Sequence, residues 1–87
     1  SDLGAVAAIV SSLRSRPIAA RTCVVGEVGL SGEVRAVRRV AERVREAEKM
    51  GYERILVPAG GKMIGKTTID VVPVESMDRA ISELGLG

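Results

Sequence analysis

The chain has 87 residues, no Phe or Trp and one Tyr, so its core must be built from Val, Ile, Leu and Ala. Such a length allows one small domain or part of one, and so aliphatic a core favours self-association. A net charge of +2 does not demand a nucleic-acid partner, and no apolar run is long enough to span a membrane. The single cysteine excludes an internal disulfide and fits a reducing compartment, so we expect a cytoplasmic protein. Because the first residue is Ser1 and not Met, we expect a fragment, a processed product or a trimmed chain.

Two elements are predicted in the first part of the chain. Apolar side chains at helical spacing predict a buried helix over residues 2–14. Residues 21–36 are predicted to form a hairpin, because β-branched residues flank a turn that contains Gly29 and Gly32. Cys23 is interpreted as a small buried side chain of the first hairpin strand, since the chain has no His that could activate a thiol.

Helices and strands alternate in the second part of the chain. Residues 38–50 form the clearest predicted helix, with Arg and Glu outward and Gly51 just past its end. Its inward stripe consists of Val37, Val40, Val44 and Ala47. The remaining elements are, in order, a buried strand at 54–58, a loop at 59–67, an edge strand at 68–74 and a helix capped by Ser76. This order predicts an α/β layered fold within a single unit, residues 1–87.

One continuous stretch carries a family resemblance. Residues 25–35, Val-Gly-Glu-Val-Gly-Leu-Ser-Gly-Glu-Val-Arg, followed by a charged helix and a strand ending at Pro58, resemble the Lon-type protease domain. They are closer still to one branch, the Lon-like C-terminal domain of the bacterial RadA (Sms) recombination ATPases. The resemblance covers residues 2–58 well and 69–84 loosely. It implies the C-terminal half of a Lon proteolytic-domain fold, which is related to the second domain of ribosomal protein S5.

The resemblance also implies a function. It points to a non-catalytic scaffold module that contacts DNA and mediates homo-oligomerisation, as a ring such as a hexamer, in DNA recombination and repair. ATP and zinc are implied only for other parts of a parent ATPase, so no cofactor or metal is expected in this chain. Two alternatives stay open: a Lon-type ATP-dependent Ser–Lys protease domain and a free-standing interaction module.

The protease alternative requires a lysine that activates a serine. When the chain is aligned with the Lon pattern through Gly32-Glu33-Val34, the lysine position holds Ala41, which cannot accept a proton. The serine position falls just before Ser1, and Ser11 and Ser12 are interpreted as ordinary helix residues. We therefore expect no catalytic residue in this chain.

Residues 60–67, Gly-Gly-Lys-Met-Ile-Gly-Lys-Thr, match the phosphate-loop pattern G-x-x-x-x-G-K-T. A phosphate loop needs a helix that begins at the Lys-Thr pair. The β-branched residues that follow, with Pro73 among them, predict a strand instead. We interpret the segment as a lysine-bearing surface loop.

An arginine cluster is the candidate contact site. Its members are Arg35, Arg38, Arg39 and Arg43, at the end of the hairpin and the start of the next helix. The cluster is either a solvated face with internal pairs such as Arg38–Glu42, or a contact surface for DNA phosphates or a neighbouring subunit. Glu27 and Glu33 are expected to bind backbone or basic groups and not to act as a general acid and base.

Overall fold

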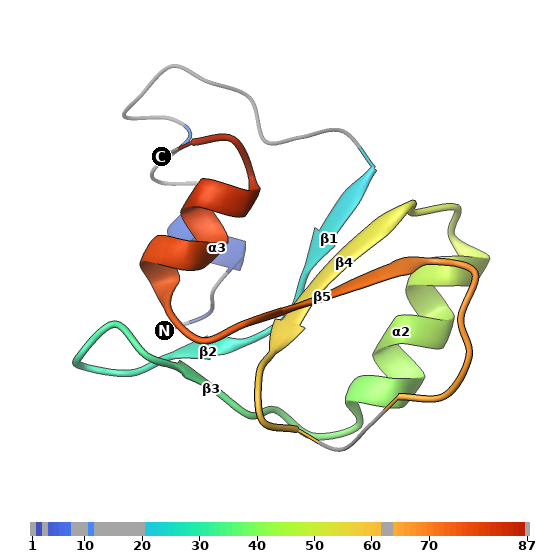
Figure 1. The fold of residues 1–87 in the computed structure, drawn as a ribbon, viewed down its shortest axis with the longest axis horizontal. Coiled ribbons are helices and arrows are strands. Elements are labelled where there is room, and N and C mark those ends of the chain that lie inside the picture. The colour runs from blue at the N-terminus through green and yellow to red at the C-terminus, as the bar shows by residue number, and fades with distance from the viewer. Residues whose placement is uncertain (1, 3, 8–10, 12–20, 62–63, 87) are drawn as a thin grey trace.

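A three-stranded parallel sheet forms the centre of the computed structural model, which describes residues 2, 4–7, 11, 21–61 and 64–86 (Figure 1). Its strands are β1 (Thr22–Val24), β4 (Arg54–Pro58) and β5 (Asp70–Val74), in the order β1-β4-β5. A second, antiparallel pair is formed by β2 (Glu27–Val28) and β3 (Val34–Arg35). The mixed α/β character that the sequence predicts is thus confirmed.

Both faces of the parallel sheet are covered by apolar side chains. On one face, Leu56 and Val74 pack with residues of α3 (Met77–Glu83). On the other, Ile55 and Val57 pack against Val44 and Ala47 of α2 (Val40–Lys49). Successive residues of a strand point to opposite faces, so a strand between two layers must be apolar throughout. This explains the continuous run of Ile, Leu and Val in β4.

The predicted hairpin over residues 21–36 is right only in its second part. Thr22–Val24 does not pair with the following strand but lies parallel to β4, with Cys23 opposite Ile55. The hairpin itself is formed by β2 and β3 alone. The N–H of Val25 still donates to Leu56 O at 2.9 Å, so the chain leaves the parallel sheet only after Val25. Cys23 is half-buried rather than buried, and this burial raises the pKa of its thiol.

The helix predicted at 38–50 begins later, at Val40, because Arg39 adopts a left-handed conformation with φ 61°. Its end is confirmed: Gly51, with φ +87°, follows the helix in the conformation that glycine adopts without a Cβ clash. The cap of α3 is also confirmed, since the N–H of Arg79 donates to Ser76 Oγ at 3.1 Å. None of the helices in the described ranges has the length and hydropathy to cross a membrane.

The first predicted helix is described only in part. Residues 4–7 and 11 are helical, and the N–H of Ala5 donates to Asp2 Oδ1 at 3.0 Å, as expected of a cap. Ser11 is a half-buried helix residue, as predicted. Ser12 and the other residues predicted to complete this helix lie outside the described residues.

One half-buried arginine joins the sheet to α3. The guanidinium of Arg54 donates to the backbone oxygen of Glu83 at 2.8 Å and pairs with the carboxylate of the same residue. Arg54 is 27% exposed and Glu83 is 24% exposed, so water screens this pair less than a fully exposed one. The pair therefore helps to hold α3 against its face of the sheet.

Candidate nucleic-acid interface

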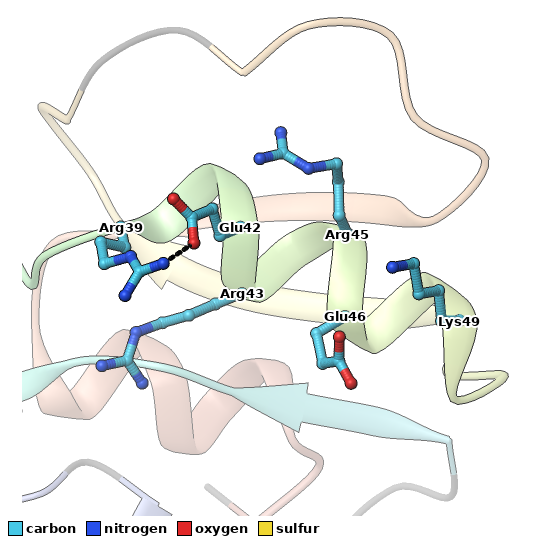
Figure 2. A pocket seen from close by; sticks show the side chains of 6 residues that line it. All are labelled: Arg39, Glu42, Arg43, Arg45, Glu46 and Lys49. Carbon is cyan, nitrogen blue, oxygen red and sulfur yellow. Dashed lines mark hydrogen bonds and ion pairs between the residues drawn. The ribbon is translucent and has the colours of Figure 1, made fainter.

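The outward face of α2 gathers most of the cluster of basic residues. Burial of Val44 and Ala47 against the sheet turns the other faces of this amphipathic helix to solvent. Side chains of both signs line a shallow depression of about 460 Å³ on the outward face (Figure 2). They are Arg39, Glu42, Arg43, Arg45, Glu46 and Lys49. The ten-residue helix is about 15 Å long, which sets the length of this surface.

Two contacts made by arginine side chains organise the start of α2. Glu42 forms an ion pair with Arg39, and Figure 2 shows the two side chains meeting above the first turn. Nε of Arg43 donates to the backbone oxygen of Arg38 at 3.1 Å. The predicted Arg38–Glu42 pair is wrong, because Arg38 precedes the helix and i,i+4 spacing applies only within one.

The four candidate residues of the sequence analysis separate into two groups. Arg38, Arg39 and Arg43 lie together at the start of α2. Arg35 belongs to β3, and its guanidinium lies 3.3 Å from a carboxylate oxygen of Glu33, so it is already engaged within the hairpin.

The four candidate residues leave out two members of this surface: Arg45, which the sequence shows in the same run of arginines, and Lys49. Both line the same depression as Arg39 and Arg43. Helical spacing from Glu42 could have found them, because Arg45 follows Glu42 by three residues, Lys49 follows Arg45 by four, and residues three and four apart share a helix face. In the described ranges, Arg38, Arg43 and Lys49 form no ion pair. The surface therefore carries an excess of positive charge that its own carboxylates do not neutralise.

A second, larger hollow lies on the other side of the first turn of α2. This groove, of about 1010 Å³, runs between the start of α2, the end of β4, the following loop and β5. Its walls are mainly apolar, with Val40, Ile64 and Val71 among them, and Arg39 borders it. Ala41, at the position where the Lon pattern has lysine, is exposed and lines the groove. Its methyl group offers no proton acceptor there.

The loop that resembles a phosphate loop does not have the geometry of one. Residues 64–67 have no regular structure, and the next element is the strand β5, not a helix. Thr67 Oγ1 donates to Ile69 O at 2.7 Å, so its hydroxyl is used within the loop. Glu48 of α2 accepts hydrogen bonds from Thr68 Oγ1 at 2.7 Å and from its N–H at 2.8 Å, which fixes the loop against the helix.

Glu33 has the structural role expected of it. Its carboxylate accepts a hydrogen bond from the N–H of Ser31 at 2.9 Å and pairs with Arg35. Bonds from its own N–H and from that of Ser31 hold the pKa of Glu33 below its ordinary value. A carboxylate stabilised in its ionised form is a poor general acid at neutral pH.

Comparison with known proteins gives one family and a consistent set of relatives. The model of the family described as subunit ChlI of Mg-chelatase matches residues 1–61. DNA repair protein RadA of Pseudomonas aeruginosa is 44% identical over 85 residues, which are 97% of this chain and 19% of that protein. The RadA proteins of Listeria monocytogenes and Bacillus subtilis are 38% and 50% identical, over 94% and 67% of this chain and 18% and 13% of those proteins. The chain thus spans about a fifth or less of the length of these relatives.

Proposed function

The chain belongs to the protein family described as subunit ChlI of Mg-chelatase, and we propose that it is a non-catalytic, Lon-like module of the RadA type. In this proposal it contacts DNA and neighbouring copies during recombination and repair. The similarity to relatives named DNA repair protein RadA supports this assignment. ATP hydrolysis and zinc binding are assigned to other parts of a longer parent protein, since the relatives extend far beyond this chain.

The observation that carries the DNA contact is the row of cations on the outward face of α2. Arg43, Arg45 and Lys49 lie on this helix of about 15 Å, and Arg38 and Arg39 immediately precede its first residue. That length matches roughly four nucleotides of a strand at 3.4 Å each. Guanidinium groups bind phosphate oxygens in a two-pronged geometry that suits such a backbone.

The chemistry of this surface favours phosphates over bases. Tyr52, the one aromatic residue, is half-buried against the core cluster and lies beyond the end of α2, so no ring stands among the cations of this surface. Contacts from arginine and lysine to phosphates position a protein on nucleic acid without discriminating its sequence. We therefore propose sequence-independent binding along the sugar–phosphate backbone.

A salt titration of DNA binding tests the proposal. Fluorescence anisotropy with labelled oligonucleotides of unrelated sequences gives the affinity at each KCl concentration. The double variant Arg38→Glu with Arg39→Glu should weaken binding to all sequences alike, and it should reduce the slope of log K against log salt by about two. Such uniform weakening is the signature of lost phosphate contacts.

The matched control is a second double variant, Arg21→Glu with Arg79→Glu, which changes the net charge by the same amount. Arg21 lies just before β1 and Arg79 lies on α3, so neither belongs to the α2 surface. The proposal requires the α2 variant to lose much more affinity than this control. Equal losses would show an effect of net charge alone, and unchanged binding in the α2 variant would leave its arginines as a solvated face.

A further inference from the structure

The strand β5 forms one edge of the parallel sheet, because the order β1-β4-β5 places it beside β4 alone (Figure 1). Its bonds to β4 use every second residue. The N–H of Asp70 donates to the residue just before β4 at 3.0 Å, and the oxygen of Val74 accepts from the residue just after β4 at 2.9 Å. Backbone groups of successive strand residues point to opposite sides, so Val71 and Pro73 direct theirs away from the sheet.

The backbone groups of these two residues are free at this edge. In the described ranges, no hydrogen bond reaches the N–H or the oxygen of Val71 or the oxygen of Pro73. Proline has no N–H, so only Val71 offers both a donor and an acceptor on this side of β5. A proline on an edge strand also limits how far another strand can extend along it. The edge therefore suits a short segment that binds reversibly better than a permanent further strand.

The groove beside the start of α2 lies along the same edge. Val71 and Pro73 both line it, and its volume of about 1010 Å³ gives room for an aliphatic side chain. A residue that pairs directly with Val71 points its side chain to the same face of the sheet, which is the α2 face. That side chain would enter the groove between the apolar walls that Val40 and Ile64 provide. Its burial there would favour binding.

Charged groups at the two ends of the groove select the neighbours of that aliphatic residue. The side chain of Asp70 is 72% exposed, and its one ion pair in the described part of the chain is a 4.0 Å contact with Arg54. A basic residue paired with Asp70 would lie on the same face as its carboxylate. Arg39 lies toward the other end, because α2 leads into β4 through a short turn and so begins near the strand ends. Glu42 engages Arg39, but the guanidinium stays 68% exposed and has donors left for a second carboxylate.

We propose that β5 binds a short extended segment of another protein as an additional antiparallel strand. The segment places an aliphatic residue opposite Val71, a basic residue opposite Asp70 and an acidic residue opposite Pro73, on the side of the groove where α2 begins. The aliphatic residue exchanges both backbone bonds with Val71, and the acidic residue donates its N–H to the oxygen of Pro73. Antiparallel pairing is the more stable arrangement per residue. Main-chain bonds supply affinity in this kind of recognition, and alternate side chains supply specificity.

Fluorescence anisotropy in the absence of DNA tests this contact. The probe is the peptide Gly-Glu-Thr-Ile-Lys-Gly with an uncharged fluorophore at one end and an amide at the other, so the basic surface of α2 does not attract it by net charge. Methylation of the Ile nitrogen removes the bond to Val71 O and should weaken binding by about tenfold or more. Methylation of the Thr nitrogen, which points away from β5, is the matched control and should leave the affinity unchanged. Equal effects of the two methyl groups, or no saturable binding, would overturn the proposal.

A charge exchange tests the residue that faces Asp70. Asp70→Lys should weaken binding of the peptide by about two- to tenfold, and a peptide with Glu in place of Lys should restore it. Asp78→Lys, at an exposed position of α3, changes the net charge equally and should bind the original peptide as the unmodified chain does. Circular dichroism should show the same folded spectrum for both variants. Equal weakening in both, or no restoration by the exchanged peptide, would refute the proposed register.

Hydrogen exchange at the Val71 amide identifies the occupant of the edge. In the chain alone this N–H should exchange faster than that of Asp70, which donates to the sheet, and the bound peptide should slow it. Slow exchange at Val71 without peptide would show that a second copy occupies the edge, which would overturn the proposal. Failure of the peptide to bind a longer protein that carries this chain would assign the edge to another segment of that protein, with the same consequence. Because no DNA is present, each of these results is independent of the proposed DNA contact.

Discussion

Replacing Val44 with Asp is expected to lower the free energy of unfolding by about 3–5 kcal/mol. Val44 is completely buried between α2 and the sheet, among Ala47, Ile55 and Val57. Losing the burial of a valine side chain costs roughly 1.5–3 kcal/mol. A carboxyl group without a hydrogen-bond partner in the same apolar site adds about 1–3 kcal/mol. A domain of this length has a total stability of about 4–13 kcal/mol, so much of it would be lost.

Urea denaturation followed by far-UV circular dichroism measures the effect. The midpoint should fall by about 1.5 M or more, given a slope of roughly 1–2 kcal/mol per M for a small domain. Val44→Ala is the matched control for lost packing, and the extra loss in Val44→Asp isolates the buried carboxyl group. Arg45→Ala, on the outward face, should stay within about 0.5 kcal/mol of the unmodified chain. Equal losses in Arg45→Ala and Val44→Asp would refute the assigned buried face of α2.

Four further results are expected. The pKa of the Glu48 carboxyl group lies below its ordinary value of 4.5, because the Thr68 hydroxyl and, to a lesser degree, the Thr68 N–H donate hydrogen bonds to it. The stabilisation from these bonds is present above pH 4.5 and is lost as the pH falls through the pKa of the folded state. The urea midpoint should therefore drop on acidification, and it should drop less in Glu48→Gln. Arg39→Gly should leave stability unchanged or raise it by up to about 1 kcal/mol, because glycine relieves the left-handed strain; a clear loss in the urea midpoint would contradict this. Peptide turnover should be absent, and activity that serine-directed inhibitors or Ala41→Glu abolish would overturn that expectation. Calorimetry should detect no binding of ATP with Mg²⁺ at the 60–67 loop, whereas binding lost in Lys66→Ala would contradict the interpretation of that loop.

The sequence by itself determined the features that depend on near neighbours along the chain. The stop of α2 at Gly51 and the cap of α3 at Ser76 each follow from a residue's own backbone preference or from a side chain within three residues. The buried face of α2 follows from helical spacing, and Val44 and Ala47 are inward as predicted. The continuous apolar run of β4 likewise indicated a strand covered on both faces.

Only the tertiary structure decided which segments meet. Thr22–Val24 has the same β-branched composition whether it pairs with the next strand or with β4, more than thirty residues away. Pairing with β4 half-buries Val24 against one core cluster and Cys23 against the other, which local propensity does not encode. The segment between the parallel strands β1 and β4 contains the hairpin and α2, and its path back to the sheet is set by tertiary packing. That path includes the left-handed turn at Arg39, the ion pair of Glu42 and the groove at the start of α2. The candidate arginines are therefore readable in the sequence, but their division between hairpin and helix is a consequence of packing.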